Sequence, residues 1–159
     1  MRHWLVKTEP EAFSIDDLRR SGRTTWDGIR NYQARNFMRD DMKLGDPVIV
    51  YHSNAKPPGV IGLGEVVREA YPDHFSWDPS HKYFDPKATP DNERWMMVDV
   101  GYVDTFPRLV SLEELREAPE LAGMPLVSKS RLSVQPVTPE QFKAICALAR
   151  RDLPSWARG

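Results

Sequence analysis

The sequence has one cysteine and no long apolar run, and these absences exclude several classes of protein. Cys146 cannot form an intramolecular disulfide, and its place in the apolar stripe of Phe142, Ile145 and Ala149 is typical of a small buried side chain. No apolar segment reaches the length that spans a bilayer. The start, MRHWLVKTEP, lacks the layout of a secretory signal. We therefore expect a cytoplasmic protein, or a nuclear one if the source is eukaryotic.

An excess of charge is also missing. The 22 basic and 23 acidic side chains give a formal net charge of -1, so the composition does not offer the broad basic surface that binds duplex nucleic acid through counterion release. Any affinity for nucleic acid must come from a local patch and a shaped pocket. The 159 residues are predicted to form one domain over 1–159, with its core in 2–150 and a short tail in 151–159.

Catalytic and metal-binding motifs are scarce. Asp27, His52 and Ser53 are the residue types of a hydrolase triad, but no G-x-S-x-G elbow accompanies them. The histidines at 74 and 81, with Asp78, lack the H-x-x-x-H spacing on a predicted helix and have no cysteine partner. The glycine patterns of Rossmann folds and phosphate loops are absent. We expect a protein that is not an enzyme and that holds no metal and no cofactor.

Local patterns predict helices and strands in alternation. Three helices are predicted to begin after the capping residues Ser14, Ser111 and Thr138. Each of these residues is followed three positions later by an acidic or amide side chain. Gly22 ends the first of these helices, and a fourth helix is expected over 31–42 from its apolar spacing. Strands are expected over 3–8, 48–52, 60–67, 95–103 and 106–110.

Two features shape the predicted sheet. Only Asp104 and Thr105 separate the last two strands, which favours a hairpin. Glycines at 59, 62 and 64 interrupt an apolar run, which indicates a bulge, a sharp bend or a close backbone approach. We expect an α+β domain with a mostly antiparallel, strongly bent sheet and helices packed at its ends. The aperiodic segment 71–92 is a long loop, and such loops are often functional.

Two clusters contain the residue types that recognise a nucleobase. The stretch TWDGIRNYQARN, residues 25–36, places Trp26, a turn glycine and Asn31 close together, and an indole provides the face on which a base stacks. Polar groups follow a buried strand at Tyr51, His52 and Ser53. From the residues alone, Trp26 as core, Asn31 as a helix cap and His52 as a turn residue stay open.

Long ordered blocks of the sequence resemble the EVE domain. These blocks are HWLVKTEP, TTWDGIRNYQARNFMRDDMKLGDPVIVYHSN, GVIGLGEVVREAYPDH and RWMMVDVGYV, and the resemblance extends from residue 3 to about residue 149. It implies a PUA-like fold, a small β-barrel with peripheral helices akin to the YTH readers of methylated adenine. It also implies binding of modified bases in DNA or RNA, and a base-sized pocket lined by the segments 26–32 and 51–53.

The resulting hypothesis is that a splayed or flipped nucleotide binds in an aromatic pocket at the open end of the barrel. The predicted base-binding residues are Trp4, Trp26, Asn31, Tyr32, Tyr51, His52 and Ser53. The predicted phosphate contacts are Lys7, Arg30, Arg35, Lys129 and Arg131. Two alternatives stay open: a nucleic-acid-linked hydrolase or base-modifying enzyme working from Asp27 and His52, and a protein-interaction module using the aromatics of 71–83.

Overall fold

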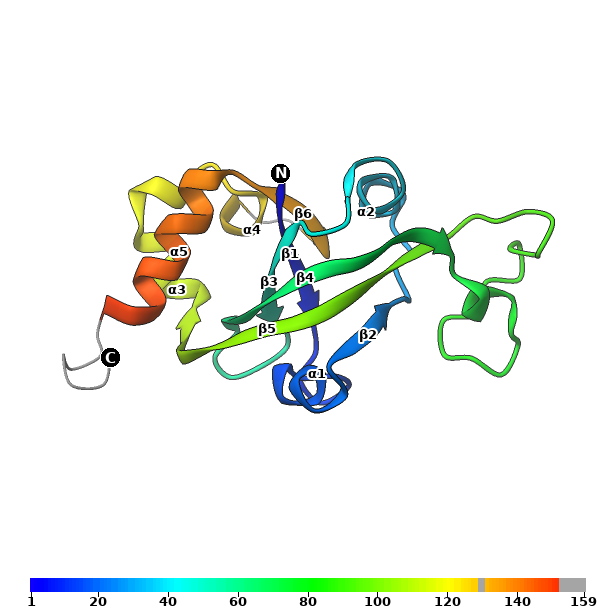
Figure 1. Ribbon diagram of the computed structural model, residues 1–159, viewed down its shortest axis with the longest axis horizontal. Helices are drawn as coiled ribbons and strands as arrows, with labels where there is room; N and C mark the ends of the chain where they lie inside the picture. Colours follow the sequence, from blue (N-terminus) through cyan, green and yellow to red (C-terminus); the bar gives the residue numbers. More distant parts are fainter. Residues whose placement is uncertain (129–130, 152–159) are drawn as a thin grey trace.

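A computed structural model describes residues 1–128 and 131–151 of the chain (Figure 1). In that part, six strands form one sheet in the order β2-β5-β4-β3-β1-β6. β1 and β3 are parallel, and the other neighbouring pairs are antiparallel. The strands are β1 (His3–Thr8), β2 (Arg23–Trp26), β3 (Pro47–His52), β4 (Gly59–Pro72), β5 (Met96–Ser111) and β6 (Val134–Val137).

The helices begin where the capping motifs predict. Ser14 and Ser111 form full capping boxes with Asp17 and Glu114, and the Thr138 hydroxyl accepts from the Gln141 N–H at 3.1 Å. The helical elements are α1 (Ile15–Ser21), α2 (Tyr32–Asn36), η1 (Phe37–Asp41), η2 (His74–Trp77), α3 (Leu112–Glu117), η3 (Pro119–Leu121), α4 (Pro125–Ser128) and α5 (Pro139–Arg151). The helix predicted over 31–42 is confirmed, with its second half a π-helical turn.

The α+β class is confirmed, and the sheet is bent but not closed. Its order leaves β2 and β6 as edges, so the strands do not complete a barrel. The predicted irregularity at the glycines is confirmed by register shifts between Val60 and Gly62 and between Leu63 and Gly64. A Cβ at Gly62 would lie 2.6 Å from the carbonyl oxygen of Asp104, so the backbones of β4 and β5 approach closely there.

The predicted hairpin at Asp104 and Thr105 is wrong. β5 continues through both residues, which pair with Leu63 and Gly62 of β4. The long partner strand holds β5 extended across this point, so the bulges bend the pair and the chain does not reverse (Figure 1). Sequence patterns also missed the short edge strands β2 and β6.

Apolar side chains pack on both faces of the sheet. One cluster centres on Trp4, Val6 and Trp26 and includes α1 and η1, and the other centres on Leu5, Ile49 and Ile145 and includes α3 and α5. Neighbouring β1 residues alternate between the clusters, as strand geometry requires. Cys146 is only partly buried, and burial raises the pKa of its thiol.

None of the helices within 1–128 and 131–151 has the length and apolar character needed to cross a membrane.

Candidate functional site

A cleft of about 780 Å³ opens beside Trp26, on the side of the first core cluster. This volume is within the range of small-molecule pockets. Its walls come from five separate segments. These are the end of β1 with the chain before α1, the end of β2 with the turn after it, the turn after β3, the loop 73–92, and the chain before β6. The lining residues are Lys7, Thr8, Glu9, Ala12, Phe13, Thr24, Thr25, Trp26, Asp27, Gly28, Ile29, Ser53, Asn54, Tyr83, Arg131 and Ser133.

Trp26 combines a place in the core with a place at the cleft wall. It is the last residue of β2, where it pairs with Val98 of β5, and it is only 6% exposed. Core packing fixes the orientation of the ring, and the exposed remainder lies at the cleft. Because its surroundings hold the indole rigidly, little conformational entropy is lost when a planar ligand stacks on it.

The turn after Trp26 provides polar groups to the cleft. The Thr25 hydroxyl donates to the carboxylate of Asp27 at 2.7 Å, which orients that carboxylate. Gly28 has φ +76°, and its N–H donates to Oδ2 of Asp73 at 3.1 Å. The Asp27 carboxylate is therefore an oriented acceptor in the cleft lining, which also contains the carboxylate of Glu9.

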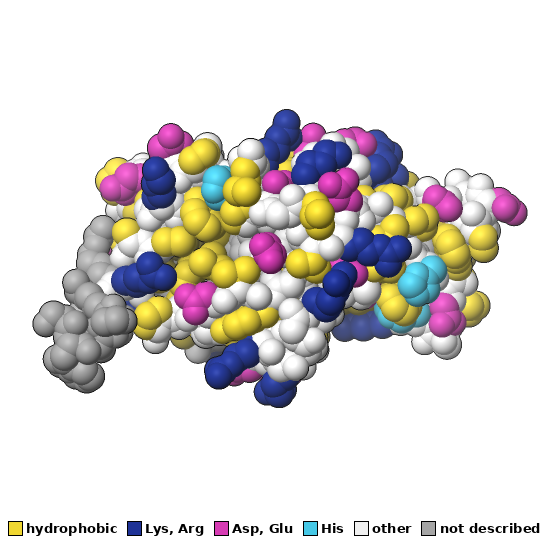
Figure 2. All heavy atoms as spheres, viewed as in Figure 1, with side chains coloured by type: hydrophobic (Ala, Val, Ile, Leu, Met, Phe, Trp, Pro, Cys, Tyr) yellow, Lys and Arg dark blue, Asp and Glu magenta, His cyan; other side chains and the backbone are white. Residues whose placement is uncertain are grey.

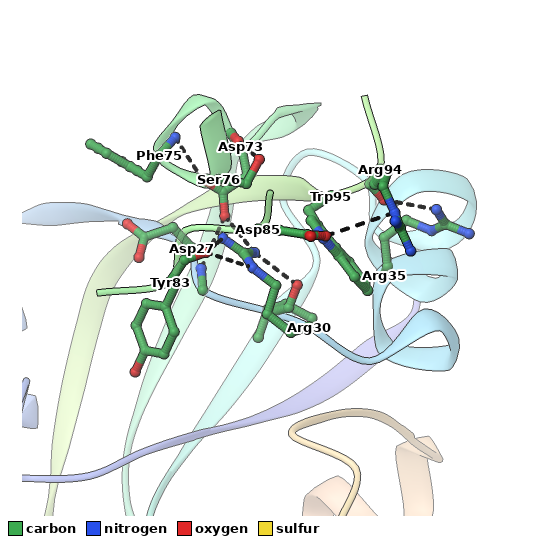
Figure 3. Close-up of polar contacts among 12 residues, drawn as sticks. Asp27, Arg30, Arg35, Asp73, Phe75, Ser76, Tyr83, Asp85, Arg94 and Trp95 are labelled. Atoms are coloured by element: carbon green, nitrogen blue, oxygen red, sulfur yellow. Dashed lines mark hydrogen bonds and ion pairs between the residues drawn. The ribbon is translucent and has the colours of Figure 1, made fainter. Parts of the chain in front are cut away.

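Tyr83 brings the long loop to the cleft. A Cβ at Gly28 would lie 2.7 Å from two ring atoms of Tyr83, so the ring packs directly on the glycine backbone. Arg30 fixes the loop, since its Nε and Nη2 donate to the carbonyl oxygen of Tyr83 at 3.0 and 2.7 Å. Figure 3 shows the Arg30 guanidinium between Asp73 and Tyr83.

Asp73 is the centre of this network. Its side chain is fully buried and pairs with Arg30 at 2.9 Å, and it also accepts from the N–H groups of Gly28 and Phe75. These donors compensate for the loss of hydration when the Asp73 carboxylate is buried. The network ties the loop 73–92 to the turn after Trp26, and so it shapes one wall of the cleft.

Substitution of Gly28 by alanine tests this wall. We expect a loss of stability of about 1–2 kcal/mol from the left-handed backbone and a displacement of the Tyr83 ring by the new methyl group. Gly45→Ala is the matched control, because Gly45 has φ +88° and nothing lies within 4 Å of its added Cβ. Thermal melts should show a loss in both variants, larger in Gly28→Ala because of the added contact with Tyr83, whereas ligand binding should weaken only in Gly28→Ala. Equal binding by the two variants would show that Tyr83 does not shape the cleft.

Comparison with known protein families decides the family of the chain. The family model of the EVE domain matches residues 2–148. The chain belongs to the EVE family. Human thymocyte nuclear protein 1 is 42% identical, over 94% of this chain and 75% of the human one, and the mouse protein is 46% identical, over 94% and 74%.

Solved structures of related proteins have the same fold. A hypothetical protein from Leishmania major superposes with a TM-score of 0.92 at 48% identity, covering 95% of this chain and 96% of that one. The human THYN1 protein in complex with 5-methylcytosine-containing DNA superposes with a TM-score of 0.91 at 41% identity, covering 96% of this chain and all of that one.

Part of the predicted base-binding set does not line the cleft of this EVE domain. Trp4 is fully buried, and its indole N–H donates to Asp46 at 2.9 Å. Tyr51 is buried in the second core cluster, because strand alternation points it to the opposite face of the sheet. Among the residues predicted to bind the base, Trp26 and Ser53 lie at the cleft.

Asn31 and Tyr32 lie beyond the turn, outside the cleft of the EVE domain. Asn31 caps α2 through its side-chain oxygen, which accepts from the Ala34 N–H at 3.0 Å. Tyr32 stacks on Trp95, with ring centroids 4.8 Å apart. Neither side chain lines the cleft.

His52 has a structural role in the EVE domain. Its Nε2 accepts from the N–H of Ile15 at 3.1 Å, so the imidazole completes the first turn of α1. Burial lowers the pKa of His52. Because this nitrogen lone pair is already engaged, it is not available as a general base, and His52 is not at the cleft. Of the two residues from which the enzyme alternative would work, Asp27 lines the cleft and His52 does not.

The lowered pKa of His52 predicts a pH dependence of stability. As pH falls below about 6.5, the unfolded chain takes up a proton that the buried imidazole does not, so the free energy of unfolding decreases until the pH passes the folded pKa. In His52→Gln, whose amide oxygen can accept from the same N–H, this component should vanish. Urea titrations of both proteins between pH 5 and 7.5 measure the difference. Parallel stability curves would contradict the assignment.

The predicted phosphate contacts also separate into groups. Lys7 lies at the cleft, but its ammonium is 5.8 Å from the centroid of the Tyr51 ring, on the far face of the sheet, and burial lowers its pKa. Arg30 forms an ion pair with Asp73 and donates to the Tyr83 carbonyl oxygen.

The other predicted phosphate contacts lie in different places. The Arg35 guanidinium lies over the Tyr32 ring, and Arg131 lines the cleft. Lys129 lies outside the described residues.

Charges of both signs are interspersed on the face shown in Figure 2, so no broad field of one sign covers it. In the part of the chain that the structure describes, no three acidic, histidine or cysteine side chains are grouped as a metal site would need.

Proposed function

We propose that this domain binds a modified nucleobase of DNA or RNA in the cleft beside Trp26, without catalysing a reaction. The observation that carries the proposal is the rigid indole at the wall of a cleft of about 780 Å³. A second support is the likeness to the human THYN1 protein, whose structure is a complex with 5-methylcytosine-containing DNA.

The base enters the cleft as an unpaired or flipped nucleotide and stacks on Trp26. Stacking on an aromatic side chain contributes about 1–3 kcal/mol per base, and flipping a base out of a duplex costs a few kcal/mol. The free energy gained by stacking therefore does little more than offset the cost of flipping the base. Further contacts must supply the net binding affinity. Arg131 at the cleft is the cation for an adjoining phosphate.

The polar groups of the cleft favour a base with an exocyclic amino group. A carboxylate accepts from the N4 amino group of cytosine, and Asp27 is oriented toward this role by its bond from Thr25. The hydroxyl groups of Ser53 and Ser133 can donate to ring or carbonyl acceptors. A methyl group buried against Phe13, Ile29 or Trp26 adds about 0.8 kcal/mol, so it gives preference rather than absolute selection.

A binding screen tests the proposal. Short single- and double-stranded DNA and RNA oligonucleotides with and without 5-methylcytosine or another base modification are titrated against the protein. The methyl contribution predicts that the modified oligonucleotide binds about four times more tightly than its unmodified partner. Equal affinity for the whole panel would contradict the proposal, and mass spectrometry of the recovered oligonucleotides should show no product.

The same screen separates the alternatives. An enzyme releases an altered base or strand, whereas a reader shows saturable binding alone. A protein-interaction module that uses the loop aromatics would show no oligonucleotide binding that responds to Trp26. The cytoplasmic or nuclear location inferred from the sequence stays a prediction, which imaging of a tagged protein checks.

A further inference from the structure

Outside the cleft, a second group of planar and cationic side chains lies at the surface. We call Tyr32, Arg35, Arg94 and Trp95 the Tyr32 patch. The Tyr32 ring stacks on Trp95 at 4.8 Å with an interplanar angle of 27°. The Arg35 guanidinium lies over the same ring, with its carbon 4.8 Å from the centroid. Arg94 is also near both rings, at 5.8 Å from Tyr32 and 5.9 Å from Trp95.

The exposure of Tyr32 is not explained by its packing. Trp95 is 5% exposed and its indole N–H donates to Asp85 at 2.7 Å, so it belongs to the framework of the loop. Tyr32 lies on top of it and stays 49% exposed. The Tyr32 ring stacks on the buried Trp95 indole, and the Arg35 guanidinium lies over the same ring. A nucleobase would therefore stack on the exposed part of the ring or on the Arg35 plane, since aromatic rings and arginine planes both serve this purpose.

The charges of the patch leave one arginine without a carboxylate. Arg94 faces Asp85 at 3.7 Å, and the nearby Arg30 is paired with Asp73 at 2.9 Å. Within the described ranges, Arg35 forms no ion pair. It donates to the carbonyl oxygen of Arg94 at 2.8 Å and to the side chain of Asn36 at 3.0 Å. The hydrogen bond from Arg39 is the main reason why the pKa of Asp40 is lowered, and the Arg35 charge makes a smaller contribution. Its positive charge is therefore available to one phosphate.

The patch is connected to the cleft through Arg30. The Arg30 guanidinium carbon lies 5.9 Å from the ring centroid of Tyr83, which lines the cleft, and 5.6 Å from that of Trp95, which supports the patch. Figure 3 shows Tyr83 and Trp95 on opposite sides of Arg30, with Arg35 and Arg94 beyond Trp95. A nucleic-acid strand that leaves the cleft over Tyr83 would reach Tyr32 next.

We infer that the Tyr32 patch is a second nucleic-acid subsite, which binds an unpaired nucleotide of the strand whose modified base occupies the cleft. The nucleotide stacks on Tyr32 or on the Arg35 plane, and its phosphate contacts Arg35. This inference rests on the proposed function and adds to it that the ligand is a strand of several nucleotides rather than a free base. The subsite reads no base edge, so it tolerates any sequence beside the modified base.

Titrations with a fluorescently labelled single strand that carries one 5-methylcytosine test the inference. We expect Tyr32→Ala to weaken binding about tenfold through the lost stack. Arg35→Gln should weaken it severalfold and lower the slope of log affinity against log salt by about one phosphate contact. Neither variant should change the ratio of affinities for modified and unmodified strands, and neither should change the affinity for the free modified nucleoside.

Three controls make the result specific. Arg39→Gln removes one positive charge from the neighbouring turn, where Arg39 pairs with Asp40 at 2.8 Å, and it should bind like the native protein. Tyr32→Phe keeps the ring and removes only the hydroxyl that accepts from Arg94, so it should retain binding. Arg35→Lys keeps the charge and should restore the salt slope. If Tyr32→Ala does not fold, the Arg35 variants decide the question alone.

The failure of the inference can be distinguished from the failure of the proposed function. If the native protein binds no modified strand, the proposed function fails. If the native protein binds and Trp26 variants do not, while Tyr32→Ala and Arg35→Gln bind as tightly as the native protein, the cleft stands and the second subsite is excluded. Weakening by Arg39→Gln equal to that by Arg35→Gln would indicate a diffuse charge effect and would also overturn the inference.

Discussion

Replacing Trp26 by leucine is expected to reduce the affinity for a strand with one modified base by about tenfold or more, because a stack is worth about 1–3 kcal/mol. Leucine keeps an apolar side chain where Trp26 packs into the first core cluster, but it has no aromatic face for the base. Alanine would leave a cavity and cost about 3–5 kcal/mol of stability, so leucine separates binding from folding more cleanly. Fluorescence anisotropy measures the change.

The matched control is Trp77→Leu. Trp77 is a partly buried tryptophan in η2 that does not line the cleft. This variant should lose some stability and retain native affinity. If both leucine variants bind equally well, Trp26 is a core residue alone, and the cleft needs another explanation.

Among the substitutions proposed as tests, replacing Asp73 by alanine should have the largest effect on stability. Removing one partner of a buried ion pair typically costs about 3–5 kcal/mol, because the other charge is left uncompensated. The Arg30 side chain is 21% exposed and can regain some hydration, so we expect the lower end of this range. That corresponds to a decrease in Tm of about 6–12 °C for a domain of this size.

The same substitution should also open the cleft. Without Asp73, Arg30 no longer holds the Tyr83 carbonyl in place, and the loop loses its bond to the Gly28 N–H. Asp78→Ala is the control in the same loop, since Asp78 is exposed and bonds only to Ser80 and to backbone nearby. It should change stability by less than about 0.5 kcal/mol. Similar melting curves for the two variants would contradict the role of Asp73.

Local signals in the sequence were sufficient to predict α1, α3, α5 and the helix of α2 and η1, but not the short elements η2, η3 and α4. A cap such as Ser14 with Asp17 acts within one turn, so three or four residues determine it. The hairpin predicted at Asp104 was wrong because its outcome depends on distant residues. A residue pair that permits a turn also permits an extended strand. The choice was made by pairing with β4, which lies some forty residues earlier in the chain.

The candidate site was predictable only in part. Trp4 and Trp26 both lie in strands, so their sequence patterns do not distinguish them. The parallel pairing of β1 with β3 places Trp4 in the interior, where its indole N–H donates to Asp46. A functional role was expected for the aperiodic loop, but the sequence did not place Tyr83 at the cleft. The ion pair between Arg30 and Asp73 holds the loop so that Tyr83 contacts Gly28. Residues this far apart in the sequence show no periodic pattern that would indicate such a contact.

The central claim is that the ligand stacks on Trp26. The most direct test is to follow the indole N–H signals of the five tryptophans by NMR while a strand with one 5-methylcytosine is added. The signal of Trp26 should shift in proportion to saturation, whereas those of Trp4, which is bonded to Asp46 in the core, and of Trp77 should stay in place. Saturable binding that leaves the Trp26 signal unmoved would contradict the account.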